Sequence, residues 1–445
     1  MKARLFQIYF SLASSFWFLP ALMAVGAAGL ALLSVSLDHE LGKDVLSDVD
    51  FVWSGGAEGA RSVLSVIAGS IMTVVSIVFS LTITTLAQTS SHFGPRVLRT
   101  FTSDRGNQAV LGTFIATFVY CLMVLRTVRT EDNALFVPFV SVNVGLLMAL
   151  ASLGVLIYYI HHVSRSIQAD HLIASVAADF QATLPRVFPR QLGERGPGLC
   201  GYAMPDELDA QTVQSLVSPK EGYLLSVNAD QLMELAQKHQ LVFHLYSRPG
   251  EFLIKGACLG NIASNRHVDE KLEEALAGCF EWGHTRTPYQ DILFPMQQLA
   301  EIAAHALSPG INEPFTAMTC IDWMGACLRA VAQVEPPSPF RYDAEGSLRV
   351  VTREISFEEI AGQAFHPIRL YGSSNPALMR HLLGAIGNLR PHLCRTADRD
   401  ALIRHVELIQ EDLHHIVNES ERKSTRRAAD KTLVTLAENN TGQGC

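Results

Sequence analysis

The sequence predicts an α-helical membrane protein with four transmembrane helices and an α+β cytoplasmic domain. The first observation is that residues 1–160 hold four apolar segments, each near the ~20 residues that cross the hydrocarbon core of a bilayer. These segments lie at 14–36, 62–88, 108–128 and 135–160. The second observation is that the rest of the 445-residue chain mixes short β-type runs with amphipathic helical patterns, which is typical of a soluble domain.

Changes in composition divide the chain into five expected segments. They are a transmembrane domain of four helices at 1–160, a cytoplasmic helix and linker at 161–220, a small β-rich module at 221–262, a mainly helical cytoplasmic domain at 263–418 and a disordered tail at 419–445. The tail is assigned to disorder because it is polar and rich in charge. The net charge of −8 and the lack of a basic block argue against a nucleic-acid partner.

Charged residues between the apolar segments indicate the orientation. The first loop, at 38–58, is acidic, whereas Arg96, Arg99 and Arg105 follow the second segment and Arg165 follows the fourth. Because cytoplasmic loops carry an excess of Lys and Arg, this bias places both termini of a multi-pass protein in the cytoplasm.

The second apolar segment carries small polar residues at helical spacing. They recur every three or four residues, as Ser62, Ser65, Gly69, Thr73, Ser76, Ser80, Thr84, Gln88 and Ser91. This spacing gathers them on one face of a helix. One interpretation is a helix–helix contact, where small residues allow close approach and hydroxyls bond to their own backbone carbonyls. The other is the lining of a pore, with Ser65, Thr73, Ser76, Ser80, Thr84 and Gln88 as candidates.

Basic residues flank this face and are candidates for a gate or mouth. His92, Arg96 and Arg99 follow the second apolar segment, and Arg126 and Arg129 end the third. The last two arginines have two interpretations. They either extend to the membrane surface and pair with Glu131 and Asp132, or they form a basic lip that attracts anions.

The soluble half contains two local patterns that predict defined structure. Strands are expected at 223–227, 241–246 and 252–254, around a helix at 229–239 that Asn228 caps. A second pair of strands is expected at 348–357, and helices at 376–418.

A tight αα-hairpin is predicted between two amphipathic helices that flank residues 308–314. Its candidate residues are Ser308, Pro309, Gly310, Asn312 and Pro314. We expect Gly310 to adopt a φ that ends the first helix, Asn312 to cap the second and Pro314 to begin it. The alternative is that exposed amides and Asn312 hold an anion or another ligand at the start of the second helix.

Catalytic and metal-binding patterns are weak in this sequence. Glu301, His305 and Asp322 come nearest to a catalytic group, but helical residues four apart pair routinely. His161 and His162 are adjacent and so face apart on a helix, which argues against a metal site. No nucleophile setting or phosphate loop stands out, so we expect no enzyme, no cofactor and no metal.

Two stretches resemble the signatures of a bacterial family of predicted membrane proteins, known as domain of unknown function 2254. The first is SIVFSLTITTLAQTSSHFGPRVLRTFTSDRGNQAVLGTFIATFVYCLMVLRTVR, and the second is QDILFPMQQLAEIAAHALSPGINEPFTAMTCID. The second departs from the usual family pattern at Pro295-Met296 and at Glu313. The resemblance spans nearly the whole chain and implies a bacterial inner-membrane protein with a cytoplasmic domain. It implies no activity.

Two functions are therefore expected. The first is a homo-oligomeric inner-membrane channel for ions or small solutes, lined by the hydroxyl face of the second helix and assembled or gated by the cytoplasmic domain. Several copies are needed because four helices alone make a poor conduit. The alternative is a membrane-anchored sensor or scaffold whose soluble domain binds a partner without conduction.

Overall fold

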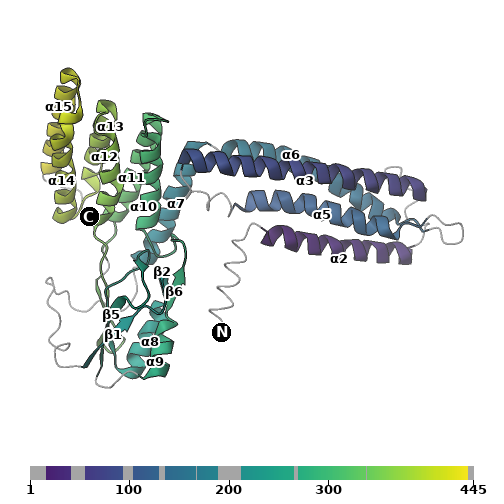
Figure 1. The fold of residues 1–445 in the computed structure, drawn as a ribbon, viewed down its shortest axis with the longest axis horizontal. Coiled ribbons are helices and arrows are strands. Elements are labelled where there is room, and N and C mark those ends of the chain that lie inside the picture. Colours follow the sequence, from purple (N-terminus) through teal and green to yellow (C-terminus); the bar gives the residue numbers. More distant parts are fainter. Residues whose placement is uncertain are drawn as a thin grey trace. The chain divides into compact units, whose positions relative to one another are not determined.

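The computed structural model describes residues 17–41, 56–93, 104–129, 136–166, 168–188, 212–264, 269–336 and 338–438 (Figure 1). The chain divides into two compact units. We call Met1–His171 the membrane unit and Leu172–Cys445 the C-terminal unit.

The described part of the membrane unit contains four long helices, which confirms the predicted fold class. They are α2 (Phe18–Leu41), α3 (Ala57–Phe93), α5 (Arg105–Thr127) and α6 (Phe139–Ser166). All four are long and apolar enough to cross a membrane. The helix α3 has 37 residues, which at 1.5 Å per residue gives it a length of about 55 Å. It is therefore much longer than the ~30 Å hydrocarbon core requires.

The helix α5 lies at the centre of the membrane unit. Within an apolar stretch of 18 residues, 56% of the residues of α5 are buried, against 22% in the corresponding stretch of each of the other three helices. Small residues allow the helices to approach closely. A Cβ atom added at Gly112 of α5 would lie 2.5 Å from Sδ of Met23 in α2. Ala31, Ala60 and Ala116 are buried in the same core, and α5 therefore positions its three neighbours.

Two β-sheets form the first part of the C-terminal unit. The larger sheet has the order β1-β5-β3-β8-β7 and the smaller one β4-β2-β6. The bounds are β1 (Thr212–Val217), β2 (Gly222–Val227), β3 (Val242–Leu245), β4 (Phe252–Leu253), β5 (Cys258–Ser264), β6 (Phe280–Gly283), β7 (Phe340–Tyr342) and β8 (Leu348–Val351). All pairs are antiparallel except β3 with β8, where Phe243 pairs with Val350.

The β-rich module is larger than the expected 221–262. It begins at β1, continues to β6 and takes in the β7–β8 hairpin from about 60 residues further along the chain. The difference arises because β3 pairs with β8, a long-range contact that leaves no local trace in the sequence. The helix α8 (Ala229–His239) has the predicted bounds, and Asn228 Oδ1 accepts from Gln231 N as predicted. A shorter helix, α9 (Glu270–Ala277), precedes β6.

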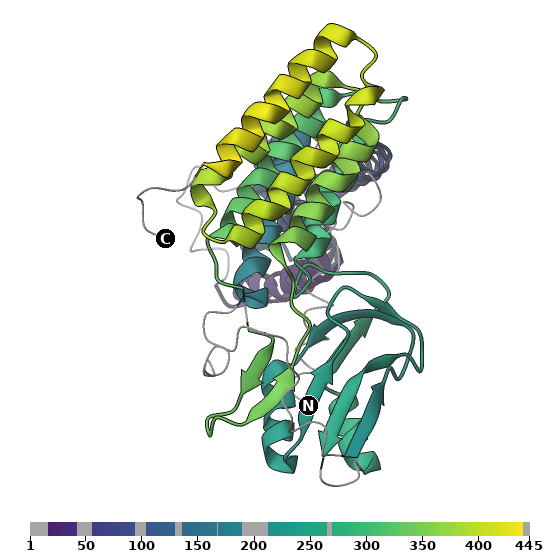
Figure 2. The same cartoon turned by 90° about the vertical axis from the view of Figure 1, so that its left-hand side faces the viewer.

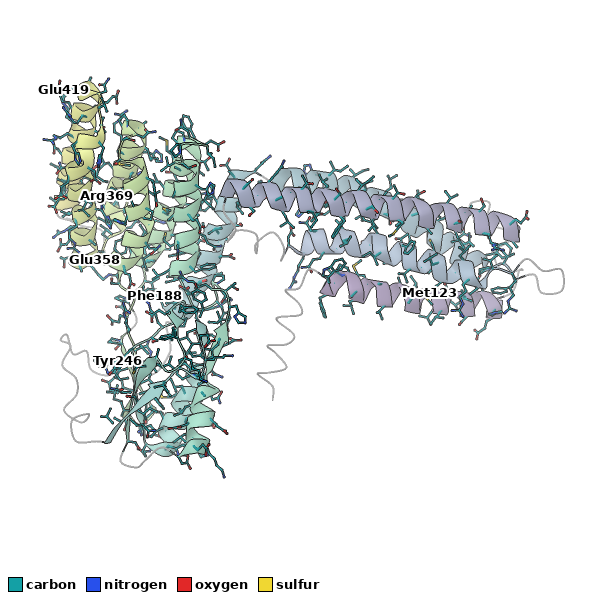
Figure 3. All side chains as sticks on the ribbon, in the orientation of Figure 1. Met123, Phe188, Tyr246, Glu358, Arg369 and Glu419 are labelled. Atoms are coloured by element: carbon teal, nitrogen blue, oxygen red, sulfur yellow. The ribbon has the colours of Figure 1, made fainter. Side chains whose placement is uncertain are left out.

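Helices form the rest of the C-terminal unit. A helix α7 (Ala169–Val187) leads into it, and the others lie side by side in Figure 2. They are α10 (Leu293–Ala306), α11 (Pro314–Ala332), α12 (Phe357–Gly372), α13 (Pro376–Asn388), α14 (Thr396–Asp412) and α15 (Glu419–Ala437), with short 3-10 turns at Arg390–His392 and Leu413–His415. Arg369 of α12, labelled in Figure 3, pairs with Asp412 of α14 at 2.5 Å.

Two expectations for this region are wrong. Residues 419–437 form the helix α15 rather than a disordered tail, because Thr425, Ala429, Thr432 and Leu436 give it a narrow face that is buried. Residues 439–445 lie outside the described part of the chain. The stretch expected to hold two strands contains only β8. It then enters α12, where Ser356 Oγ accepts from Glu359 N in the pattern of a capping box.

Candidate functional site

The hydroxyl face of α3 points away from the other described helices of the membrane unit. Its buried face, which packs within the unit, carries Leu64, Ala68, Ile71 and Val78. The six candidates for pore lining are all exposed, namely Ser65, Thr73, Ser76, Ser80, Thr84 and Gln88. Because the residues are spaced by 100° along the helix, the two sets lie on opposite sides of it. Within the described part of the membrane unit, the hydroxyl face is therefore not a helix–helix contact.

Other hydroxyls make the helix contacts inside the membrane unit. The hydroxyls of Thr82 in α3 and Tyr159 in α6 lie 2.7 Å apart, and both residues are buried. Thr117 of α5 and Ser152 of α6 lie 3.0 Å apart. On the outer face, by contrast, Thr73 Oγ1 donates to a carbonyl of its own helix, that of Gly69, at 3.1 Å. Ser76 and Thr84 do the same.

Exposed apolar side chains lie among the hydroxyls of this face and beside them. Val66 is 64% exposed and Ile77 61% exposed. Phe79 and Ile83 are also exposed. A helix with one buried face, one polar face and apolar flanks has surface left for lipid or for another protein chain.

The gate candidates fall at both ends of the unit. His92 lies in the last turn of α3, while Arg96 and Arg99 lie outside the described residues. Arg126 and Arg129 are exposed at the end of α5, and Arg129 N donates to Phe136 O at 3.3 Å. Their expected partners, Glu131 and Asp132, also lie outside the described residues, so both interpretations of the arginines stay open.

Two carboxylates that sequence analysis missed join the ends of the helices. Asp38 of α2 accepts from Val140 N at 2.7 Å and from Ser141 Oγ at 2.6 Å, and it thereby caps α6. Asp104 caps α5 by accepting from Gly106 N at 2.8 Å, and it lies 2.5 Å from Nε2 of His162. An Asp directly before a helix was a usable signal for Asp104. Nothing local indicated the cap from α2 to α6.

The loop at 308–314 confirms one expectation and contradicts two. Pro314 begins α11 as predicted. Asn312 does not cap it, because the N-cap position is Glu313 and no side chain supplies a cap bond. Gly310 does not adopt a positive φ; Asn312 does, at 52°. The chain reverses two residues later than expected, and the αL position therefore falls on Asn312.

Backbone bonds inside this loop weaken its interpretation as an anion site. The N–H groups of Ile311 and Asn312 both donate to Ser308 O, at 3.0 and 2.9 Å. Glu313 N donates to Ala306 O at 2.7 Å. Pro309 and Gly310 are exposed. With three successive amides engaged, the loop has few donors left for a ligand.

One residue of the possible catalytic group, Asp322, has a partner outside the group. Asp322 Oδ1 lies 2.7 Å from Nε2 of His381, a residue of α13. His162, which sequence analysis weighed as a metal ligand, instead pairs with Asp104.

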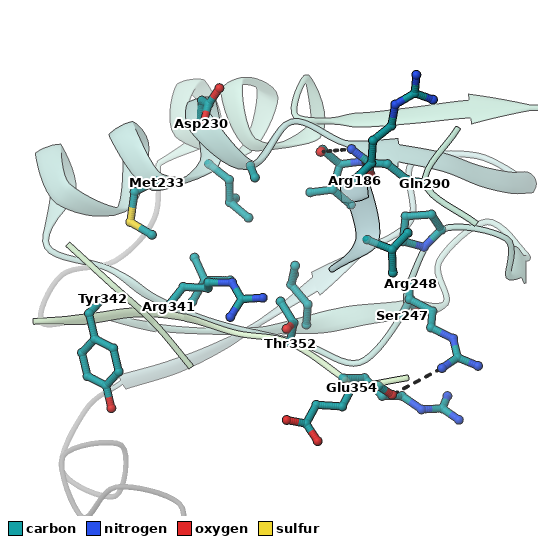
Figure 4. Close-up of a pocket in the computed structure, with 18 of the residues that line it drawn as sticks. Arg186, Asp230, Met233, Ser247, Arg248, Gln290, Arg341, Tyr342, Thr352 and Glu354 are labelled. Carbon is teal, nitrogen blue, oxygen red and sulfur yellow. Dashed lines mark hydrogen bonds between the residues drawn. The ribbon is translucent and has the colours of Figure 1, made fainter. Parts of the chain in front are cut away.

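A cavity of about 440 Å³ lies in the C-terminal unit (Figure 4). Its walls come from α7, α8, both sheets and the β7–β8 hairpin, over residues 186–355. Apolar side chains make up much of the wall, namely Val227, Leu232, Met233, Leu245, Val350 and Ile355. The cavity leaves no local pattern in the sequence, because segments far apart in the chain enclose it.

Three arginines of the cavity wall have partners outside it. Arg248 Nη1 donates to Glu359 at 2.9 Å and Arg353 Nη1 to Glu251 at 3.1 Å. The hydrogen bond from Arg248 lowers the pKa of Glu359. The guanidinium of Arg186 lies over the ring of Tyr289. The fourth, Arg341, points toward the centre of the cavity in Figure 4.

Comparison with known proteins agrees with the architecture. A family described as "Predicted membrane protein (DUF2254)" matches residues 13–388. The chain is 30% identical to the uncharacterized proteins Rv1290c of Mycobacterium tuberculosis and Mb1321c of Mycobacterium bovis, over 94% of this chain and 80% of each relative. No solved structure matches the chain. The chain, with its four apolar helices and mixed C-terminal unit, belongs to the DUF2254 family of predicted membrane proteins.

Proposed function

We propose that the protein is a homo-oligomeric channel for ions or small solutes, lined by the hydroxyl face of α3. The observation that carries this proposal is that all six pore-lining candidates are exposed on the side of α3 opposite its buried face. The interior of one chain is filled by side chains such as Leu64, Phe114 and Tyr120. A path for solutes must therefore lie between copies of the chain.

The chemistry of the hydroxyl face suits such a path. Each hydroxyl of Thr73, Ser76 and Thr84 donates to its own helix, but its oxygen keeps a lone pair that water or a cation can contact. Gln88 has an amide that lipid cannot satisfy. The exposed apolar side chains of α3, such as Phe79, supply surface for contact with neighbouring copies or lipid.

The proposal includes an orientation in a bacterial inner membrane. The charge bias of the loops supports cytoplasmic termini, which would place the C-terminal unit in the cytoplasm, where it can assemble or gate the channel. A reporter fused after Ser166 is then expected to be cytoplasmic, and one inserted near Val49 periplasmic. The opposite result at either position would contradict the orientation.

A second function is favoured by a different observation. The cavity of about 440 Å³ in the C-terminal unit is of a size that holds small ligands. It supports a membrane-anchored sensor, in which the helices only anchor and the C-terminal unit binds a partner or ligand without conduction.

Cysteine accessibility distinguishes the two functions. Thr73→Cys, Ser76→Cys and Ser80→Cys are made one at a time in a background without the native cysteines. The protein in liposomes is treated with a small, charged, water-soluble thiol reagent. A water-filled path predicts modification at all three positions and a change in ion flux, because only thiols that contact water form the reactive thiolate readily.

Two matched controls lie on the same helix. Ile71→Cys is on the buried face and Phe79→Cys on the exposed apolar flank, and neither is expected to react. Ser76→Leu is expected to reduce flux severalfold while the oligomer stays intact, because a bulky apolar side chain obstructs and dewets a polar path. Unreactive hydroxyl-face cysteines, with no flux above empty liposomes, would refute the channel and favour the sensor.

A further inference from the structure

We propose that the cavity in the C-terminal unit binds a small organic anion, whose charged group meets Arg341 and whose apolar body fills the rest of the space. This inference concerns a ligand site and does not depend on conduction. It stands whether the membrane unit is a channel or an anchor.

The partners of Arg341 distinguish it from the other arginines of the cavity wall. Its Nη1 donates to two backbone carbonyls, those of Ser338 and Phe340. No carboxylate of the described residues forms an ion pair with it. Burial lowers the pKa of Arg341, and the charge of Glu354 offsets this effect only in part. A half-buried cation of this kind is stabilised when an anion enters.

Three acidic residues that line the cavity or contact its other arginines are already engaged. Asp343 lines the cavity, but its Oδ2 accepts from Arg349 Nε at 2.6 Å and its Oδ1 from Ser347 N at 2.8 Å. Glu251 and Glu359 are bound by Arg353 and Arg248. The carboxylates that balance the other arginines therefore do not neutralise Arg341.

Figure 4 shows the Arg341 side chain running into the cavity between Met233 and Thr352. Arg186, at the edge of the same view, extends away from it. A guanidinium at the centre of a cavity can present two parallel N–H groups to a carboxylate or a phosphate. Its Nε and Nη2 form no hydrogen bond with the part of the chain that the structure describes.

The rest of the cavity wall favours a ligand with an apolar body. Leu232, Met233, Leu245 and Val350 provide an apolar surface, and burying a ring or short chain against it is favourable at roughly 25 cal/mol per Å². Ser247 and Thr352 add hydroxyls that can orient the ligand. Inorganic phosphate lacks the body and a neutral hydrocarbon lacks the charge, so neither satisfies both parts of the site.

The test uses the full chain in lipid nanodiscs and isothermal titration calorimetry, with empty nanodiscs to subtract partition into lipid. The probes are 1-naphthoate and 1-naphthyl phosphate, which share one ring system and differ in the anion. Their neutral counterpart is 1-naphthalenemethanol. We expect saturable binding of at least one anion at one site per chain, and at least tenfold weaker binding of the neutral analogue and of inorganic phosphate.

Three variants test whether the anion binds in this cavity at Arg341. Arg341→Gln is expected to weaken binding of the anion at least tenfold, and Met233→Trp, which fills the cavity, to abolish it. Arg353→Gln is the matched control, because this arginine lines the same cavity but is more than half exposed and already paired with Glu251. The affinity of Arg353→Gln for the anion is expected to stay within about threefold of that of the wild type.

Each possible result decides the question. Equal affinity of Arg341→Gln and the wild type, equal affinity of the neutral probe, or no saturable binding of either anion would overturn the proposal. Melting temperature and oligomer size show whether each variant is folded. If Arg341→Gln does not fold, retained binding by a folded Met233→Trp variant overturns the proposal, and lost binding supports it.

Discussion

The carboxylate of Asp104 lies 2.5 Å from Nε2 of His162, and this contact ties the start of α5 to the last turns of α6. Asp104 also caps α5 through Gly106 N. One side chain thus organises two helix ends of the membrane unit. Gly106 is needed for the geometry, because a Cβ atom there would lie 2.9 Å from His162 Nε2.

Replacement of His162 tests this contact. We expect His162→Ala to lower the free energy of unfolding by about 1 kcal/mol, since a part-buried hydrogen bond to a carboxylate is lost. Asp104→Ala is expected to cost about 2 kcal/mol, because the helix cap disappears as well. The measurement is thermal unfolding in detergent. His161→Ala, on the adjacent exposed histidine, is the control and is expected to be neutral. An equal effect of both histidine variants would contradict the assignment.

The cap that Asp38 provides for α6 gives a second prediction. Asp38→Ala removes the acceptor of Val140 N and of Ser141 Oγ, and is expected to destabilise the membrane unit by about 1–3 kcal/mol. Glu40→Ala, an exposed acidic residue on the same helix, should change stability by less than about 0.5 kcal/mol. Urea unfolding in detergent measures the stability of both variants against the wild type. A neutral Asp38→Ala would show that the cap is not important for stability.

In the 308–314 loop, we expect Gly310 to tolerate a larger side chain better than Asn312, although glycine is usually the residue that a turn requires. Gly310→Ala is expected to be tolerated within about 0.5 kcal/mol, because Gly310 lies in open space and has no positive φ. Asn312→Val is expected to cost about 1–2 kcal/mol, because a β-branched residue is strained at a φ of 52°. Asn312→Gly serves as the control and should be close to neutral or better. Thermal melting of the three variants gives the order of their stabilities. A larger loss of stability for Gly310→Ala than for Asn312→Val would contradict the prediction.

A pH dependence follows from His405. Burial lowers the pKa of His405 to about 4, with a further contribution from the charge of Arg369, and its ring packs edge-on against Phe365. Below pH 6.5 the unfolded chain binds a proton that the folded chain rejects, so stability falls as the pH drops from 6.5 toward 4. At pH 5 the loss is about 2 kcal/mol.

The variant His405→Gln isolates this effect. Between pH 7.5 and pH 5, its free energy of unfolding is expected to fall by about 2 kcal/mol less than that of the wild type. The reason is that the glutamine side chain does not titrate. His239→Gln, on the exposed end of α8, should follow the wild-type curve. Chemical unfolding at the two pH values measures the difference. Parallel curves for the wild type and His405→Gln would rule out a titrating His405.

Features that depend on neighbouring residues were predicted from the sequence alone. The four apolar spans follow from hydrophobic length, and α8 follows from its amphipathic period and the Asn228 cap. Pro314 marks the start of α11 because proline has no N–H to lose there. The hydroxyl spacing on α3 also placed the six candidates on one face, as the structure shows.

Tertiary structure decided the features that depend on residues far apart in the chain. The periodicity of α3 defines its faces, but only packing against α5 and α6 shows that the hydroxyl face points outward. The β3–β8 pair joins residues about 100 positions apart, and the cavity beside it draws on four separate segments. The helix α15 is too polar to be recognised from composition, and it is stabilised by the burial of its narrow face against α13 and α14. Such contacts arise from shape and burial in three dimensions, and a local pattern of residues carries no record of them.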